Sequence, residues 1–275
     1  MGQGASPVTA ADDTAPGEWE RFDTKRRLLR FGLVLVVLGA TVASWRALDV
    51  RYVYIETAPE NIADLFGRMY PPDAAYAGEI VDPMIQTINI AVIGTVLALL
   101  LAAPVAYISA RNTTPNRATH ALGTVIVAGS RSIHSLIWGL VFVIVFGTGV
   151  LAGILAVAFR SIGFIAKLLS EEIEEIDAAA TEAIRATGGS ELDVLIYGIL
   201  PQIKPALAGI SVYRWDINVR EATITGFVGA GGIGVELQNS IGAFRWDAVL
   251  TILIAILIVV VASESISAYV RRKVR

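Results

Sequence analysis

Six long apolar stretches, separated by shorter polar ones, dominate the chain. They lie near residues 28–46, 84–109, 131–149, 151–169, 203–225 and 248–268. Each is close to the roughly 20 residues that a helix needs to cross a bilayer. The pattern therefore predicts an all-α, polytopic membrane protein with about six transmembrane helices. A further apolar stretch at 118–130 predicts a helix that lies along the cytoplasmic face.

Charge asymmetry predicts the orientation of these spans. Basic residues gather before the first span, between the second and third, and at the end of the chain: Lys25, Arg26, Arg27 and Arg30; Arg111 and Arg117; Arg271, Arg272, Lys273 and Arg275. With six spans, all three groups lie on one side, which the excess of Lys and Arg identifies as cytoplasmic. The acidic 47–82 loop then lies outside.

The N-terminal region predicts a tail and one retained span. Residues 1–24 are rich in Ala, Thr, Gly, Asp and Pro, which is typical of a disordered cytoplasmic tail. Residues 25–275 are expected to form a single transmembrane domain. Residues 25–43 also resemble a cleavable signal. An uncleaved span is preferred, because its apolar run is long and its removal would put the basic groups on inconsistent sides.

Composition excludes several functions. The chain is 55% hydrophobic and only 17% charged, which favours a membrane protein over a soluble one. A net charge of -3 gives no basic footprint for nucleic acid. With no Cys and only His120 and His134, a metal site is not expected. We identify no catalytic grouping and no Walker A sequence.

A polar segment at 171–201 interrupts the apolar pattern. Ala, Glu and Arg residues predict a helix over 171–187, and Gly188 and Gly189 end it, because glycine tolerates the left-handed conformation. Ser190 and Asp193 form the start signal of a second helix, which Pro201 is expected to close. The segment predicts two short helices meeting at a tight corner, suited to a groove in a partner. The alternative is an ordinary helical hairpin between spans.

Ionisable residues inside the fifth span form a second informative group: Arg214, Asp216, Arg220 and Glu221, together with the amide of Asn218. Asp216 and Arg220 are four residues apart and are expected to pair, while Asn218 lies off their face. Such residues normally face protein or a watery cavity. They form either a cationic stretch beside the route of an anionic substrate or neutralised pairs that lock the spans together. Both interpretations remain open at this stage.

Three other ionisable residues fall near the third and fourth spans. Arg131 is expected to snorkel at the cytoplasmic interface. His134 is expected to be a satisfied core histidine. Arg160 is a candidate for attracting an oxyanion.

Glycines fill the connection between the fifth and sixth spans: Gly229, Gly231, Gly232 and Gly234. They formally satisfy G-x-G-x-x-G, but no strand pattern precedes them, so a dinucleotide site is rejected. We interpret them as a flexible connector and a candidate outer gate.

The 182–201 stretch resembles the coupling motif of ABC importer permeases, E-A-A-x3-G-x9-I-x-L-P. Glu182, Ala183, Gly188, Leu200 and Pro201 match, whereas Ile184 and Gly198 depart from it. From about Arg111 onward the chain resembles the permeases of bacterial phosphonate importers. The run from Tyr213 to Ala222 is the most specific likeness, and the Val228–Gly234 run also occurs in methionine-type importers.

The resemblance implies a type I importer permease in the bacterial cytoplasmic membrane, surrounded by lipid. It implies a second permease copy, an ATPase dimer that uses ATP and Mg, and an extracytoplasmic binding protein. The chain itself would bind no cofactor and would not be an enzyme. Its substrate would be a phosphonate, phosphate or phosphite, carried by alternating access.

Alternative functions are an importer of methionine or another small nutrient, an intramembrane enzyme using Asp216, Glu264 or His134, and a secondary transporter. The last two lack a paired catalytic motif and a clear internal repeat, respectively.

Overall fold

Long helices make up nearly all of this computed structural model, which describes residues 24–48 and 50–274. The expected tail at 1–24 therefore lies almost wholly outside the described residues. The chain divides into two units between Ile62 and Ala63. The first contains α1 (Thr24–Ala47) and the beginning of α2 (Val53–Met69). In this unit, Trp45 Nε1 donates a hydrogen bond to Tyr52 Oη at 2.6 Å.

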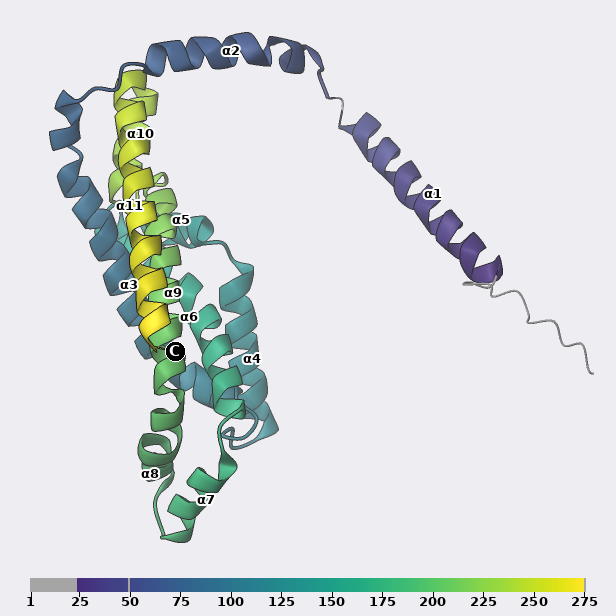
Figure 1. Cartoon of the computed structure of the whole chain (residues 1–275), viewed down its shortest axis with the longest axis vertical. Coiled ribbons are helices and arrows are strands. Elements are labelled where there is room, and N and C mark those ends of the chain that lie inside the picture. The colour runs from purple at the N-terminus through teal and green to yellow at the C-terminus, as the bar shows by residue number, and fades with distance from the viewer. Residues whose placement is uncertain (1–23, 49, 275) are drawn as a thin grey trace, which may run out of the picture. The chain divides into compact units, whose positions relative to one another are not determined.

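The second unit is a helical bundle (Figure 1). After the short 3₁₀ helix η1 (Ala75–Gly78), its long helices are α3 (Val81–Ser109), α4 (Arg117–Ser132), α5 (Ser135–Phe146), α6 (Val150–Glu174), α9 (Leu200–Gly226) and α11 (Trp246–Val274). Three short elements, α7 (Ala178–Ala186), α8 (Glu191–Asp193) and the π-helix η2 (Val194–Ile199), connect α6 to α9. The remaining helix, α10 (Ile233–Gly242), lies between α9 and α11 in the chain. Since α6 contacts α3, α4, α5 and α9, it forms the centre of the bundle.

Small residues allow the central helices to approach closely. Ala98, Ala102 and Ala106 of α3 are fully buried in the same cluster as Ala158 and Ala166 of α6. Lipid tails are as apolar as these side chains, so membrane helices associate largely through close van der Waals packing. The alanine-rich faces of α3 and α6 provide that packing.

Five helices within the described residues are long and apolar enough to cross a membrane. They correspond to the predicted spans one, two, four, five and six. The predicted third span is not one continuous helix, so that prediction is wrong in form. Helices α4 and α5 meet at 92°, and they make a sixth span only if the two are counted together as one broken span. Helix α5 has 12 residues, about 18 Å at ~1.5 Å per residue, less than the ~30 Å hydrocarbon core.

The break between α4 and α5 has a local cause. Ile133 and His134 both have extended backbones, and the His134 ring accepts the Leu136 N–H at the start of α5.

The prediction of a helix along the cytoplasmic face is also corrected. Helix α4 instead packs against α3 and α6 along the side of the bundle (Figure 1).

Candidate functional site

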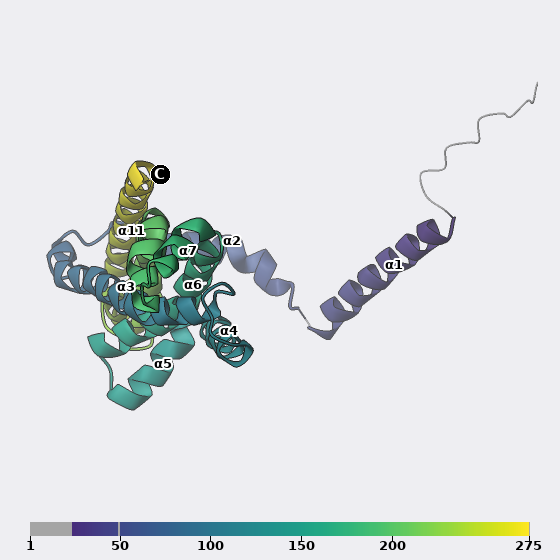
Figure 2. The ribbon, with the colours of Figure 1, turned by 90° about the horizontal axis from the view of Figure 1, so that it is seen from below.

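The corner at residues 178–201 lies at one end of the bundle, beyond α6 and before α9 (Figures 1 and 2). The single helix predicted over 171–187 is instead divided between the end of α6 and α7. Helix α6 ends at Glu174, and Asp177 begins α7 by accepting the Ala179 N–H at 2.9 Å. An N-terminal cap of this kind satisfies a backbone donor that lacks a helical partner. The chain therefore turns at 175–177 before the corner begins.

Two motifs predicted from the sequence form the turn of the corner. Gly188 has a φ of +85°, and its N–H donates to the Arg185 carbonyl at 3.0 Å. The N–H of Gly189 donates to the Ile184 carbonyl at 3.1 Å, which completes a helix-ending motif with a left-handed residue. Ser190 and Asp193 then form a reciprocal capping box. The tight corner is confirmed.

Pro201 begins a helix rather than ending one, which corrects the sequence interpretation. It lies in the first turn of α9, where its missing N–H is tolerated. The backbone between Ser190 and α9 stays helical through the π-helix η2. Gly198 lies in this π-helix, and a Cβ there would approach Thr181 Cγ2 to 3.1 Å. Close packing of α7 against η2 thus accounts for Gly198 where the motif has Ile.

The residues that match the motif share one property in the structure: Glu182, Ala183, Gly188, Leu200 and Pro201 are all exposed. Beside them Leu192 is 65% and Tyr197 69% exposed. Large apolar side chains gathered on one exposed surface are typical of an interaction site. Arg185 is ion-paired with Glu191 at 3.1 Å, and its hydrogen bonds to that carboxylate raise the pKa of Arg185. The corner therefore has a fixed turn and exposes large apolar side chains.

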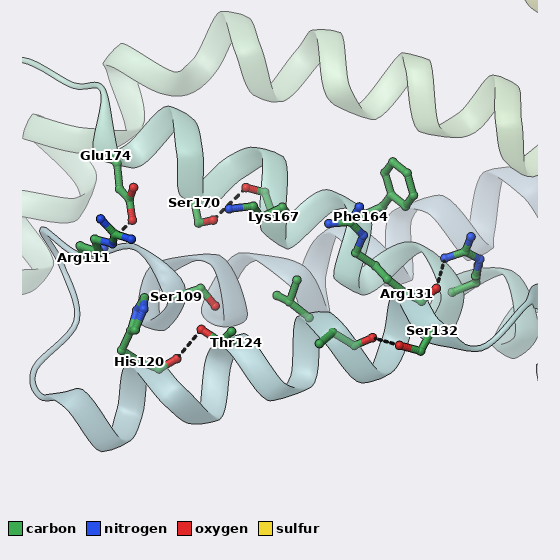
Figure 3. A pocket seen from close by; sticks show the side chains of 13 residues that line it. Ser109, Arg111, His120, Thr124, Arg131, Ser132, Phe164, Lys167, Ser170 and Glu174 are labelled. Atoms are coloured by element: carbon green, nitrogen blue, oxygen red, sulfur yellow. Dashed lines mark hydrogen bonds between the residues drawn. The ribbon is translucent and has the colours of Figure 1, made fainter. Parts of the chain in front are cut away.

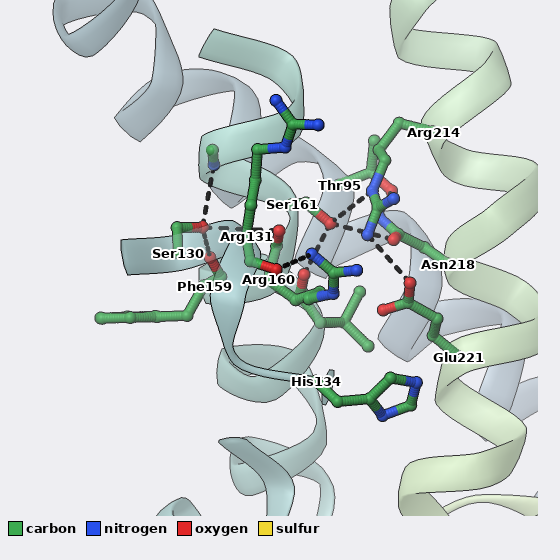
Figure 4. Close-up of polar contacts among 12 residues, drawn as sticks. Thr95, Ser130, Arg131, His134, Phe159, Arg160, Ser161, Arg214, Asn218 and Glu221 are labelled. Atoms are coloured by element: carbon green, nitrogen blue, oxygen red, sulfur yellow. Dashed lines mark hydrogen bonds and ion pairs between the residues drawn. The ribbon is translucent and has the colours of Figure 1, made fainter. Parts of the chain in front are cut away.

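A buried polar network crosses the middle of the bundle (Figure 4). Asn218 of α9 donates to Thr95 Oγ1 of α3 at 2.8 Å and accepts from Ser161 Oγ of α6 at 2.9 Å. Arg214 Nε donates to the same Ser161 oxygen at 2.9 Å, and its Nη2 contacts Glu221 at 3.1 Å. Arg214 is only 2% exposed. The network therefore joins three helices around one buried cation.

Asp216 and Arg220 form the pair that their spacing predicted. Arg220 Nη2 lies 2.6 Å from Asp216 Oδ2, and Ser263 of α11 donates to Asp216 Oδ1 at 2.8 Å. Glu264 lies 3.9 Å from the other Arg220 nitrogen. Arg220 is partly exposed, whereas Asp216 is buried. This pair lies on a different face from Asn218 and ties α9 to α11.

Two expectations near the third and fourth spans are corrected. Arg131 contacts Phe164 and accepts, through its carbonyl, the Arg160 Nη1–H at 3.0 Å. Arg160 and Phe164 lie near the middle of α6, so Arg131 lies there too and not at the end of a span. His134 is exposed and begins α5, so it is not a core residue. Sequence reasoning missed Phe164, since one aromatic residue in an apolar run carries no signal.

The glycine connector is closely packed. Gly229, Gly231 and Gly232 have positive φ values, and Gly234 lies so near α9 that a Cβ would be 2.1 Å from the Thr223 carbonyl oxygen. The Gly232 N–H donates to Gln86 Oε1 of α3 at 2.6 Å. Left-handed backbone and close approach therefore explain the glycines better than flexibility does. Helix α10, which begins at Ile233 and includes Gly234, was not anticipated from the sequence.

Within the described ranges, no three His, Cys, Asp or Glu side chains come together in a way that would hold a metal ion. The described residues offer ion pairs, buried hydrogen bonds and, at the corner, exposed apolar side chains.

Comparison with known proteins agrees with these features. Residues 94–275 match the family described as binding-protein-dependent transport system inner membrane component. A phosphite transport system permease protein of Stutzerimonas stutzeri is 35% identical over 88% of this chain and 89% of its own. A phosphate-import permease protein of Mycolicibacterium smegmatis is 37% identical over 90% of this chain and 47% of its own.

The fold is similar to that of a solved transporter. An inward-facing structure of the MetNI methionine ABC transporter matches with a TM-score of 0.61 and 23% identity, covering 71% of this chain and 96% of the other.

Proposed function

Because this chain belongs to the family of binding-protein-dependent inner membrane transport components, we propose that it carries a phosphonate or a related phosphorus oxyanion, phosphate or phosphite. It is the multi-pass permease of a bacterial ABC importer, a transport subunit and not an enzyme. The observation that supports the substrate class is the likeness to phosphite and phosphate permeases over most of the chain. A buried arginine, Arg214, agrees with an anionic cargo.

The 178–201 corner is proposed to be the part that docks on the ATPase. Its turn is held by Gly188 and the Ser190–Asp193 capping box, so it presents a rigid shape. Its exposed apolar residues offer area for burial against a partner. A second copy of the permease would bring a second corner, one for each subunit of an ATPase dimer.

Alternating access is the proposed mechanism. ATP, with Mg, would be bound and hydrolysed by the ATPase dimer, and an extracytoplasmic binding protein would deliver the substrate. Closure of the ATPase dimer would move the corner, and through it α9, so that the bundle opens outward. A shift between two conformations requires a ligand that binds them with different affinity, and ATP on the partner supplies this.

Transport in proteoliposomes tests the substrate class. The permease is reconstituted with its cognate ATPase, with ATP inside and the cognate binding protein outside, and uptake of radiolabelled phosphate, phosphite and methylphosphonate is measured. We expect ATP-dependent uptake of at least one of them and none of labelled methionine. Uptake of methionine without any phosphorus oxyanion would refute the proposal and favour the nutrient-importer alternative.

A further inference from the structure

Two arginines with no acidic partner flank one aromatic ring in the middle of the bundle. The guanidinium carbons of Arg131 and Arg160 lie 4.9 and 5.7 Å from the centre of the Phe164 ring, and that of Arg214 lies 5.1 Å from it. Arg214 is paired with Glu221. Among the described residues, neither Arg131 nor Arg160 forms an ion pair. Three cations and one carboxylate leave two positive charges in excess.

The local backbone does not balance this excess. Arg131 lies in the last turn of α4, and Arg160 Nη1 donates to the Arg131 carbonyl at that helix end. A helix C-terminus carries about half a negative charge, which is well short of two positive ones. Ionisable groups in the middle of a membrane-spanning bundle cost free energy to bury, and they normally serve transport or binding.

Two buried polar atoms at these arginines have no hydrogen-bond partner in the part of the chain that the structure describes. Arg160 Nε and Glu221 Oε2 are both buried and lack a hydrogen-bond partner among the described groups. Figure 4 shows the Arg160 side chain extending from α6 toward Arg214 and Glu221. A guanidinium presents a planar fork of donors that suits an oxyanion. Arg160 thus has a donor available where charge is also unbalanced.

A cavity leads from this cluster toward the end of the bundle that carries the corner. It has a volume of about 660 Å³ and lies between α4 and α6 (Figure 3). Its charged lining residues are Arg111, Arg131, Arg160 and Lys167 against the single carboxylate of Glu174. Lys167 is paired with Glu171 at 3.0 Å, and Glu174 accepts the backbone N–H of Arg111 at 2.8 Å. Four of the five charged side chains that line the cavity are therefore cationic.

We propose that this cavity is the inner route of the anion, and that Arg160, with the exposed Arg131, binds the oxyanion at the end of the cavity that these two residues line. The proposal rests on the proposed function, since it assigns a site to that substrate class. A doubly charged phosphorus oxyanion matches the two excess positive charges, and the cavity leads it to the cytoplasmic end. Arg160 was already a candidate from the sequence. Arg220 is not part of the proposed site, because Arg220 and Asp216 neutralise each other on another face.

Charge-selective labelling tests the cavity directly, because the chain contains no cysteine. Thr124→Cys places one thiol in the cavity lining. The permease–ATPase complex in nanodiscs is treated with an anionic or a cationic methanethiosulfonate reagent. A cleft lined by one sign of charge raises the local concentration of counter-ions at least ~10-fold. The measured quantity is the ratio of the reaction rate of the anionic reagent to that of the cationic one. We therefore expect this ratio to be about tenfold higher for Thr124→Cys than for a free thiol.

Charge removal identifies the source of that preference. In the Thr124→Cys background, Arg131→Gln and Arg160→Gln should each reduce the anionic preference several-fold, and Arg160→Lys should retain most of it. Lys204→Gln is the matched control, since Lys204 is exposed on α9 and does not line the cavity. Should Arg160→Gln fail to assemble, Arg131→Gln and Lys167→Gln still test the lining. Equal rates for the two reagents, or an equal loss in Lys204→Gln, would overturn the proposal.

Protection separates this proposal from the proposed function. Millimolar phosphate, phosphite or methylphosphonate should slow the labelling of Thr124→Cys and should do so less in Arg160→Gln. If proteoliposomes import a phosphorus oxyanion but none of these anions protects the thiol, the route is wrong and the function stands. If the anions protect but none is imported, the substrate assignment fails and the cavity remains an anion site.

Discussion

The side-chain amide of Gln202 holds the backbone of Asp177 from both sides. Its Oε1 accepts the Asp177 N–H at 2.9 Å, and its Nε2 donates to the Asp177 carbonyl at 3.4 Å and to that of Gly198 at 2.7 Å. Asp177 begins α7, and Gln202 lies in the first turn of α9. One side chain therefore fixes both ends of the corner to each other.

Removal of this amide should loosen α7. Hydrogen bonds of this kind each contribute about 1 kcal/mol net, so we expect Gln202→Leu to destabilise the helix locally by about 1–2 kcal/mol. That corresponds to roughly a tenfold rise in amide exchange over residues 178–186. Hydrogen–deuterium exchange mass spectrometry measures it. The control is Gln238→Leu, at an exposed position of α10. Equal exchange in both variants would show that Gln202 does not hold the corner.

Bulk at Gly188 should uncouple ATP hydrolysis from transport. A Cβ at Gly188 meets nothing within 4 Å, so the harm comes from its φ of +85°, which a side chain disfavours by about 1–2 kcal/mol. We expect Gly188→Val to insert normally but to lose substrate-dependent ATP hydrolysis by the complex. Gly129→Val is the matched control, because Gly129 is equally open but helical.

Charge reversal at Glu182 should have the same effect by another cause. Glu182 is exposed on α7, and Glu182→Lys changes the surface that the ATPase would meet without altering the turn. Coupled hydrolysis is again the measurement. Normal coupling in both Gly188→Val and Glu182→Lys would refute the docking role of the corner.

Neutralisation of Arg220 should impair assembly before it impairs transport. Asp216 is 3% exposed, and Arg220→Gln leaves that buried carboxylate without its ion pair. We expect a lower melting temperature and less intact complex, as measured by thermal unfolding and size-exclusion chromatography. Adding Asp216→Asn should restore both, because the buried charge is then removed as well. Normal assembly of Arg220→Gln with weakened transport would instead support a pathway role for this residue.

A methyl group at Gly234 should separate α10 from α9. The added carbon would lie 2.1 Å from the Thr223 oxygen and 2.8 Å from Gly226 Cα, both backbone atoms. Overpacking of this kind costs about 1–3 kcal/mol. We expect Gly234→Ala to lower the melting temperature of the complex. Gly242→Ala, on the same helix with open space around its Cβ, should leave it unchanged. Equal melting temperatures would mean that the two helices separate readily.

Local features of this protein were predictable from sequence because the interacting residues are close in the chain. The turn at Gly188, the Ser190–Asp193 cap and the Asp216–Arg220 pair each need at most one helical turn of context. The break at His134 was missed because the mostly polar run at 131–135 was counted as part of the third apolar stretch. Pro201 was misinterpreted because a proline near a helix end suits either terminus, and the preceding π-helix leaves no pattern.

The candidate anion site depends on contacts that no local pattern encodes. Arg131 and Arg160 come from different helices and meet only because α4 packs against α6. Phe164, which lies beside both, is one of many aromatic residues in apolar surroundings. The pairing of Arg214 with Glu221, two turns apart, likewise depends on how Ser161 of α6 orients the guanidinium.

The helical run from Glu191 to Gly226 is continuous from the corner almost to the glycine connector. It has 36 residues, or about 54 Å at ~1.5 Å per residue. Backbone contact with α10 at Gly226 and Gly234 leaves no slack at its far end. A tilt of roughly ten degrees about one end would displace the other by roughly 9 Å over that length. A tilt of the corner would thereby move the start of the glycine connector as part of the same helical run, and no residue between the two would have to relay it.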